Sequence, residues 1–147
     1  ALRFFTVYGP GQRPDLAIHK FTRMISENEP IPFYGDGSSR RDYTFVSDIV
    51  KGIRGAMSYD KSMYEVVNLG NCNTVSLSEM VKKKKKILGK KAEKNLLPMQ
   101  LGDVPQTWAN IEKPGNLFGY KPKFRFEEGL EEFIKWYQSK NDHPIKN

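Results

Sequence analysis

The segment near the start of the chain limits most strongly what this sequence can fold into. Leu2 to Val7 reads Leu-Arg-Phe-Phe-Thr-Val, an apolar run broken only by Arg3 and followed by the turn signal Tyr8-Gly-Pro10. Short runs of this kind, rich in Phe and Val and bounded by Gly and Pro, are typical of buried strands. Because such strands are usually covered on both faces of a parallel sheet, we expect a neighbouring layer to cover Leu2 to Val7.

Helical periodicity alternates with further short extended segments. Helices are expected at residues 15–27, after Ser47, at 76–88 and at 127–140, a short helix or turn at 113–118, and extended segments at 31–34, 42–46 and 64–69. Asp15 and Ser47 occupy expected N-cap positions, while Ser76 and Glu79 have the spacing of a capping box. There are too few strong strands for a complete doubly wound sheet, so the sequence predicts a small α/β or α+β lobe that forms one domain over residues 1–147.

The apolar faces of two helices can be read from the same spacing. Those expected to point inward are Ile49, Val50, Ile53 and Met57 in the helix after Ser47, and Leu130, Phe133, Ile134 and Tyr137 in the last helix. Lys84 falls on the apolar stripe of the helix at 76–88. A long aliphatic stem can lie along such a stripe while its ammonium group reaches water, so we expect Lys84 to snorkel.

The positive charge of the chain is confined to one patch. Residues 82–94 hold eight lysines and one glutamate, which accounts for the whole net charge of +7. Nucleic-acid surfaces combine spread arginines with aromatic residues, and this lysine run has no aromatic residue within it. We therefore interpret it as a solvated helix face and expect no nucleic-acid partner.

The remaining composition excludes other classes of site. Cys72 is the only cysteine, and His19 and His143 are the only histidines, so neither an internal disulfide nor a zinc site of the usual spacing is expected. No apolar run is long enough to span a membrane, and the first residues do not have the pattern of a signal peptide. We expect a cytoplasmic protein without a membrane partner.

Three loops carry residues that suit an anionic ligand. Gly35 to Tyr43 is a glycine turn that leads into two arginines. Tyr8 to Arg13 is a glycine-rich loop that contains one arginine. A guanidinium matches phosphate oxygens, so either loop can hold a phosphate or a carboxylate. From residue types alone, a surface Arg-Asp pair that closes a turn is an equally good reading of Gly35 to Tyr43. The third loop, Gln100 to Asp103, offers a carboxylate either to ribose hydroxyls or to its own backbone.

The order of motifs along the chain resembles that of a known family. Arg-Phe-Phe-Thr-Val-Tyr-Gly-Pro, Gly-Asp-Gly-x-x-x-Arg-Asp-Tyr-Thr-Phe-Val-x-Asp, Val-Asn-Leu-Gly, Gly-Asp-Val and Glu-Gly-Leu follow one another from end to end. The chain is similar in these motifs to the C-terminal, substrate-binding part of extended short-chain dehydrogenases/reductases that act on nucleotide sugars, and most similar to the UDP-glucuronate 4-epimerases among them. The resemblance implies that residues 1–8 form a strand of a Rossmann domain whose remainder lies outside this sequence.

The resemblance also implies a role for particular residues. Arg41 would contact the diphosphate of a UDP-sugar, Pro32 and Tyr34 would lie at the uracil, and Asp103 would meet the ribose. Thr6 and Arg13 would face the sugar, with Arg13 suited to a uronate carboxylate, and Phe4 would lie near the nicotinamide of NAD. Gln100 would lie at the substrate too, but several sugar epimerases have an arginine there, which puts a second diphosphate cation in doubt. A common aspartate of the family is Asn110 here.

Two features of complete family members do not occur in this sequence. A Gly-x-x-Gly-x-x-Gly turn for the NAD pyrophosphate and a Tyr-x-x-x-Lys pair for proton transfer are both lacking. We therefore expect a fragment that recognises UDP-sugars and is inactive alone. The complete enzyme would interconvert UDP-glucuronate and UDP-galacturonate through a 4-keto intermediate with NAD, as a possible homodimer. The alternatives are a UDP-glucose 4-epimerase, a nucleotide-sugar dehydratase or decarboxylase, or a non-enzymatic basic binding module.

Overall fold

A computed structural model describes residues 1–99 and 102–142 of the chain, the side chains of 141 and 142 excepted. The helices are α1 (Ala17–Ser26), α2 (Val46–Met57), α3 (Leu77–Leu88), α4 (Glu112–Phe118) and α5 (Phe126–Asp142). The strands are β1 (Leu2–Phe4), β2 (Thr6–Tyr8), β3 (Ile31–Tyr34), β4 (Arg40–Phe45), β5 (Val67–Leu69), β6 (Thr74–Ser76) and β7 (Lys94–Leu97). The predicted α/β class is confirmed.

The described strands form three small sheets. In the largest, β4 pairs in parallel with β2 and antiparallel with β6, while β1 pairs in parallel with β5 and β3 in parallel with β7. The prediction of one continuous strand from Leu2 to Val7 is therefore wrong, because the segment forms two strands. The chain bends at Phe5, whose N–H donates to the carbonyl of Leu69, so that β1 and β2 join two different sheets.

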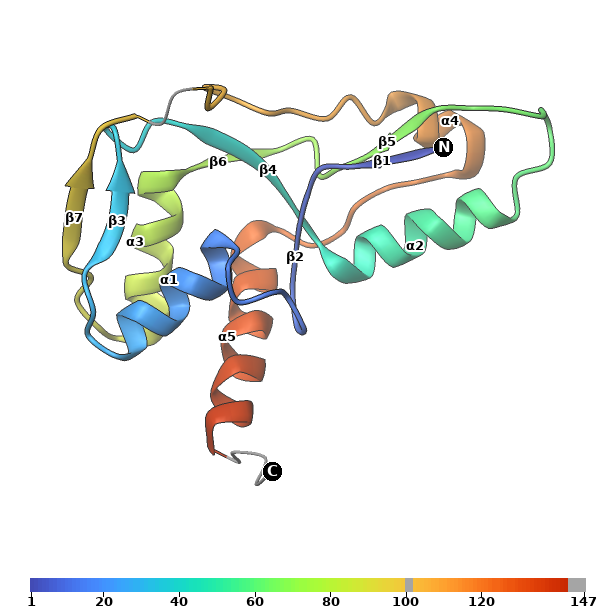
Figure 1. Cartoon of the computed structure of the whole chain (residues 1–147). Helices are drawn as coiled ribbons and strands as arrows, with labels where there is room; N and C mark the ends of the chain where they lie inside the picture. Colours follow the sequence, from blue (N-terminus) through green and yellow to red (C-terminus); the bar gives the residue numbers. More distant parts are fainter. Residues whose placement is uncertain (100–101, 143–147) are drawn as a thin grey trace.

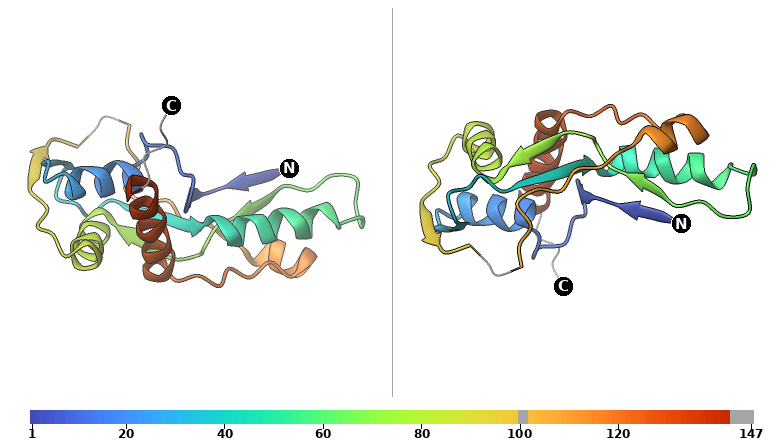
Figure 2. Two further views of the ribbon diagram at one scale, coloured as in Figure 1. Left: turned by 90° about the horizontal axis from the view of Figure 1, so that it is seen from below. Right: turned by 90° about the horizontal axis from the view of Figure 1, so that it is seen from above.

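Strand β4 connects the two ends of the molecule. It runs across the view of Figure 1 and leads directly into α2, while β3 and β7 lie side by side at one end and β1 and β5 at the other. Helices α1 and α5 both pack against α3, and α5 also packs against β4. Figure 2 shows that α2 and α4 lie together at the β1–β5 end.

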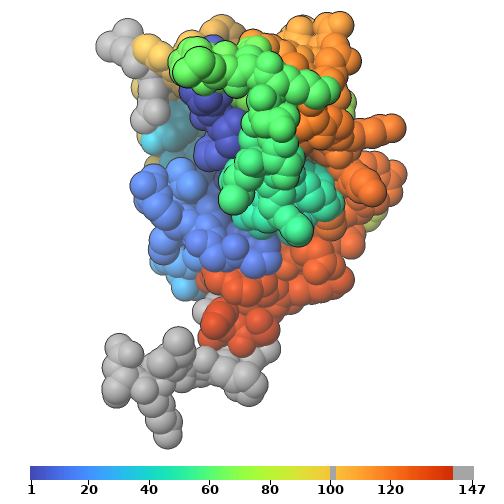
Figure 3. Space-filling model, turned by 90° about the vertical axis from the view of Figure 1, so that its right-hand side faces the viewer, coloured from blue at the N-terminus to red at the C-terminus, as the bar shows by residue number. Residues whose placement is uncertain are grey.

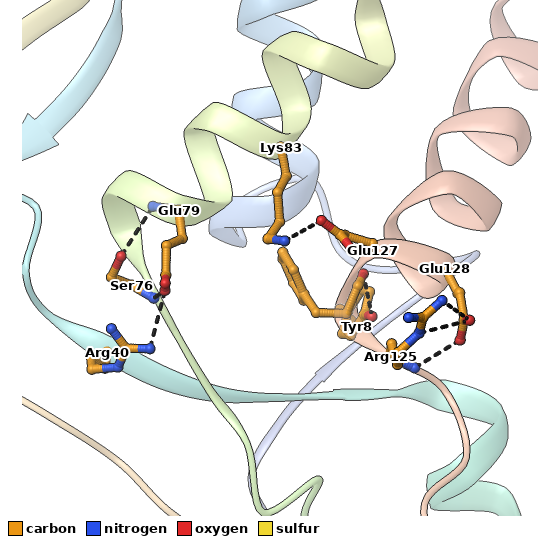
Figure 4. Close-up of polar contacts among 9 residues, drawn as sticks. Tyr8, Arg40, Ser76, Glu79, Lys83, Arg125, Glu127 and Glu128 are labelled. Carbon is orange, nitrogen blue, oxygen red and sulfur yellow. Dashed lines mark hydrogen bonds and ion pairs between the residues drawn. The ribbon is translucent and has the colours of Figure 1, made fainter.

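The main core lies between α1, α3, α5 and the strands β3 and β4. Leu130, Phe133, Ile134 and Tyr137 of α5 are all buried there, as the helical spacing predicted. Tyr8 crosses this core from β2, and its hydroxyl donates to the carbonyl of Phe126 at 3.1 Å (Figure 4). Aromatic rings therefore tie the strand β2 to the last helix.

The other end buries less apolar surface. Ile49, Leu69 and Tyr120 form its small cluster, against which Ile53 packs. The expectation that Val50 and Met57 point inward is wrong: their relative exposures are 47% and 81%. Figure 3 shows this face, where α2 and the segment after it lie beside β1.

The helix ends show which cap predictions were correct. Ser76 accepts the N–H of Glu79 at 3.0 Å, and the Glu79 carboxylate accepts the N–H of Ser76 at 2.7 Å, so the capping box of α3 is confirmed (Figure 4). The caps predicted for α1 and α2 are wrong, because their N-cap residues are Leu16 and Phe45 and neither makes a side-chain cap bond. Ser47 lies within the first turn of α2.

The lysine run is not a uniformly solvated face. Lys84 is completely buried rather than snorkelling, and its ammonium group donates to the carbonyl of Ile18 and to the hydroxyl of Thr22. Burial lowers the pKa of Lys84 well below its ordinary value of 10.5. Lys83 of α3 forms an ion pair with Glu127 of α5 (Figure 4). None of the described helices is long and apolar enough to cross a membrane.

Candidate functional site

A cleft beside β4 brings together half of the site residues predicted from the sequence. Its volume is about 230 Å³, and it is bounded by α1, β3, β4, the start of α3 and the segment around Asp103. Its lining residues are Asp15, Ala17, Lys20, Phe21, Pro32, Tyr34, Ser39, Arg41, Tyr43, Leu77 and Asp103. Four of the eight predicted site residues, Pro32, Tyr34, Arg41 and Asp103, thus share this cleft.

Arg41 is held from two sides. One guanidinium nitrogen, Nη1, donates at 2.8 Å to the carbonyls of both Arg40 and Val104. The other, Nη2, forms an ion pair with the carboxylate of Asp103. The side chain of Arg41 is 22% exposed and that of Asp103 is 34% exposed. The pair therefore reaches the cleft surface, and it joins residues far apart in the sequence rather than closing a local turn.

The neighbouring Arg40 points away to another set of partners. Its Nε and Nη2 donate to the hydroxyl and the carbonyl of Thr74 at 2.8 and 2.7 Å. Nη2 also lies 3.1 Å from the Glu79 carboxylate that caps α3 (Figure 4). Because adjacent residues of a strand face opposite ways, Arg40 anchors β4 to β6 and α3 while Arg41 faces the cleft.

Strand alternation also supplies the aromatic wall. In β3, Ile31 and Phe33 are buried in the core, whereas Pro32 and Tyr34 are partly exposed and line the cleft. Tyr43 lines the cleft from β4, and burial raises its pKa to about 12 against the opposing effect of Arg41. Tyr43 is therefore protonated at neutral pH, so it can donate a hydrogen bond but is a poor base. The cleft suits the binding of an anion beside a flat ring.

Arg13 lies in a separate hollow. This hollow, about 270 Å³, is lined by Val7, Tyr8, Gly9, Pro10, Gly11, Gln12, Arg13, Leu16 and Val46. The Arg13 side chain is 73% exposed and pairs at 3.0 Å with Asp15, which itself lines the first cleft. A Cβ at Gly9 would lie 2.6 Å from Cγ1 of Val46, so the tight path of this loop requires glycine.

The remaining predicted residues lie elsewhere. Thr6 pairs with Tyr43 in the β2–β4 ladder and lines neither hollow. Phe4 is 50% exposed on β1 and lines neither of them. Gln100 lies outside the described residues. The structure thus groups the residues assigned to a nucleotide more closely than those assigned to a sugar or to NAD.

Sequence reasoning missed several lining residues. Ala17, Lys20 and Phe21 line the cleft from one face of α1, at the i, i+3 and i+4 spacing that places side chains together. Lys20 makes no ion pair with any described residue, so the cleft has a second cation beside Arg41. The helical spacing after Arg13 was a usable signal for this face, but it does not say which side of α1 meets the strands.

The described residues offer no centre for a metal ion. No group of three or more His, Cys, Asp or Glu side chains among them is placed to hold one. What the cleft can do is bind. It combines two cations, two carboxylates, three hydroxyls and aromatic surface in a partly enclosed space.

Comparison with known proteins places the chain in a family. The model of the family described as "GDP-mannose 4,6 dehydratase" matches residues 1–133. The chain is 46% identical over 141 residues to an uncharacterized protein of Methanocaldococcus jannaschii, covering 96% of this chain and 43% of that protein. It is 38% identical over 136 residues to the UDP-glucuronate 4-epimerase of Thermodesulfobacterium geofontis, covering 92% of this chain and 42% of the relative.

A solved structure gives the same result. The UDP-glucuronic acid 4-epimerase from Bacillus cereus, in complex with UDP-glucuronic acid and NAD, superposes with a TM-score of 0.89 at 37% identity, covering 94% of this chain and 44% of that one. The chain therefore spans less than half the length of these relatives. With the family model matched over most of its residues, the chain belongs to the GDP-mannose 4,6 dehydratase family, within the nucleotide-sugar epimerases and dehydratases of the extended short-chain dehydrogenases/reductases.

Proposed function

We propose that this chain is the substrate-recognition part of an NAD-dependent nucleotide-sugar 4-epimerase that acts on UDP-glucuronate. One observation carries the proposal: Arg41, Asp103, Pro32 and Tyr34, assigned to different parts of a UDP moiety, line a single cleft. The complex of the Bacillus cereus epimerase with UDP-glucuronic acid and NAD supports the same substrate class.

The nucleotide would bind along the cleft. The uracil packs between Pro32 and Tyr34, the ribose hydroxyls donate to Asp103, and the diphosphate accepts hydrogen bonds from Arg41. Because Nη2 of Arg41 already pairs with Asp103, the diphosphate competes with that carboxylate. Lys20 supplies the second positive charge that Gln100 does not, since its side chain lines the same cleft.

The sugar would lie toward the second hollow. Arg13 donates hydrogen bonds to the uronate carboxylate. In the structure, Nη2 of Arg13 pairs instead with Asp15 at 3.0 Å, so the ligand would displace Asp15. Thr6, at the start of β2, lines neither hollow, so its assignment to the sugar rests on the family motif alone. Asp15 links the two hollows, because it lines the first and its carboxylate pairs with Arg13 of the second.

NAD would supply the hydride chemistry: it would take a hydride from C4 of the sugar and later return it. This chain would offer that cofactor Phe4, which is half-exposed on β1. Its sequence contains neither the glycine turn for the pyrophosphate nor the Tyr-x-x-x-Lys pair for proton transfer. The chain alone therefore binds and orients the substrate and does not turn it over.

Strand β1 would complete a larger sheet. Its only partner among the described strands is β5, and its residues Arg3 and Phe4 are exposed. Nearby, α2 exposes Val50 and Met57. We assign residues 1–8 to the edge at which a dinucleotide-binding domain joins, because such strands are usually covered on both faces.

The test is an assay of the full-length protein that carries this chain. With NAD present, we expect conversion of UDP-glucuronate to UDP-galacturonate, with UDP-glucose converted at a much lower kcat/KM. The isolated chain of residues 1–147, assayed beside it, should give no conversion. A preference of the full-length protein for the neutral sugar would refute the uronate assignment, and turnover by the isolated chain would refute its role as a recognition part.

A further inference from the structure

Next to Arg41 in β4 lies a carboxylate that solvent does not reach. Asp42 is completely buried, and four donors converge on it. Its Oδ1 accepts the N–H of Asn71 at 2.7 Å and the hydroxyl of Thr44 at 3.1 Å. Its Oδ2 accepts the N–H of Cys72 at 3.0 Å and that of Ala109 at 3.1 Å. A buried carboxylate is tolerated only when its oxygens are bonded in this way.

The donors belong to segments that are distant in the sequence. Besides β4 itself, they are the turn at 70–72 and the segment at 107–109. The turn is tightly fitted, because a Cβ at Gly70 would lie 2.3 Å from the Cβ of Ala109 and 3.0 Å from Oδ2 of Asp42. Cys72 takes a left-handed backbone conformation there, with φ 59°. The local chain is thus shaped around the Asp42 carboxylate.

The segment at 107–109 continues the one that holds Arg41. The N–H of Arg40 donates to the carbonyl of Pro105 at 2.8 Å, and the N–H of Thr107 donates back to the carbonyl of Arg40 at 3.1 Å. Asp103 and Val104, which bind the guanidinium of Arg41, directly precede these contacts. Residues 103–109 therefore form one strap along β4, fixed at Arg41 on the cleft side and at Asp42 on the buried side.

We infer that Asp42 is a positioning residue for nucleotide-sugar binding: its carboxylate fixes the 103–109 strap against β4, so that Asp103 and Arg41 face the cleft in binding geometry. The inference rests on the proposed function and extends it to a residue that the ligand does not touch. Asp42 points to the core and does not line the cleft. Without the carboxylate, the amides of Cys72 and Ala109 lose their acceptor and the strap loses its inner attachment.

The chain contains a matched control. Asp48 is also almost completely buried, and its Oδ2 accepts the N–H groups of Lys123 and Phe124, both at 2.9 Å. Its Oδ1 lies 3.1 Å from Nζ of Lys51. Neither Asp48 nor these partners line the cleft. Loss of this carboxylate should therefore cost stability in a comparable way without disturbing the strap.

The experiment measures UDP binding to the full-length protein by calorimetry, together with thermal unfolding. D42N should weaken UDP binding by about tenfold or more, because the amide cannot accept all four hydrogen bonds. D48N should lower the unfolding temperature but leave UDP affinity within about twofold, because the hydrogen bond from Nδ2 of Asn71 to the carbonyl of Phe124, which links the two carboxylate sites, does not involve the strap. In a double-mutant cycle, D42N and R41A should be non-additive for UDP affinity, while D48N and R41A should be additive.

The outcomes separate the inference from the function on which it rests. If the wild-type protein does not bind UDP, the proposed function fails. If it binds and D42N weakens binding no more than D48N, or if D42N and R41A are additive, Asp42 is a structural residue only and the inference is overturned. Should D42N not fold, T44V removes one donor and keeps the carboxylate. Faster hydrogen exchange at the amide of Ala109 with a matching loss of UDP affinity supports the inference, and unchanged affinity with faster exchange overturns it.

Discussion

The cleft around Arg41 and the hollow around Arg13 differ in how firmly each cation is held before any ligand arrives. Arg41 makes hydrogen bonds to two carbonyls and an ion pair with a carboxylate more than sixty residues away in the sequence. Within the described part of the chain, the Arg13 side chain has one partner, Asp15, two residues along the same exposed loop. The Arg41 side chain is mostly covered, whereas most of the Arg13 side chain is in solvent.

This difference sets what each site can contribute to binding. A side chain that is already ordered loses little conformational freedom when a ligand binds, so more of its interaction energy appears as affinity. An exposed side chain on a loop must be ordered first, and its ion pairs are worth little in water. We therefore expect the Arg41 cleft to supply most of the affinity for the nucleotide and Arg13 to supply discrimination between sugars.

The largest effect should come from Arg41→Ala in the full-length protein. If Arg41 makes charge-assisted hydrogen bonds to the diphosphate, its loss should cost on the order of 2–5 kcal/mol of UDP binding. The measurement is calorimetric titration with UDP. Arg54→Ala removes an arginine of α2 that lines neither hollow and serves as the control. Equal UDP affinity in the wild type and Arg41→Ala would show that Arg41 only holds the strap.

A smaller and more selective effect is expected from Arg13→Ala. The change should lower the affinity for UDP-glucuronate by roughly 1.5–3 kcal/mol, the range for a hydrogen bond to a charged group. It should leave UDP and UDP-glucose affinities unchanged, because neither ligand has a uronate carboxylate. Competition binding with the three ligands measures the difference. An equal loss for UDP and UDP-glucuronate would place Arg13 at the nucleotide and remove the contrast between the two sites.

How well the sequence predicted these sites depended on whether a local pattern was sufficient. Arg41 and Asp103 could be assigned to one ligand because the family motifs around them occur in order. Lys20 could not, because its place in the cleft depends on which face of α1 packs against β3. Asp42 was part of a recognised motif, but its four donors come partly from turns whose approach only the folded chain reveals.

The same limit applies to the fold. The capping box of α3 and the buried stripe of α5 were predicted correctly, because each is set by spacing within one helix. Strands β6 and β7 were missed, since they are short and form against partners distant in the sequence. Val50 and Met57 carry the right period for an inner face, yet they are exposed because the described elements pack against the Ile49 side of α2.

Lys20→Ala should weaken UDP binding less than Arg41→Ala does. Lys20 carries a compact charge on a flexible stem and makes no ion pair with a described residue, so we expect it to contribute on the order of 1 kcal/mol to UDP binding. Its contribution should shrink as salt rises from about 0.05 to 0.5 M, because exposed charges are screened. Lys51→Ala, on α2 and outside both hollows, is the control. A salt-independent loss, or none, would remove Lys20 from the diphosphate site.

The smallest effect on either ligand site, and a distinct effect on stability, is expected from Lys84→Met. Lys84 binds Ile18 and Thr22 on α1, the helix that also carries Lys20, so this variant asks whether the core beneath the cleft matters for binding. Burial lowers the pKa of Lys84 in the folded state below the 10.5 of the unfolded chain. Between these two values the unfolded state holds more protons, so the free energy of unfolding rises with pH in that window.

Methionine removes this dependence while filling much of the same space. At neutral pH, the free energy of unfolding of Lys84→Met, measured by denaturant titration, should therefore exceed that of the wild type by on the order of 1 kcal/mol. This difference in free energy should narrow toward pH 10.5. Lys85→Met, an exposed neighbour on α3, should leave the pH dependence unchanged. UDP affinity should be equal in all three proteins. If Lys84→Met also weakens UDP binding, the position of α1 depends on the buried lysine. The shape of the cleft would then depend on the helical core as well as on β4 and the 103–109 strap.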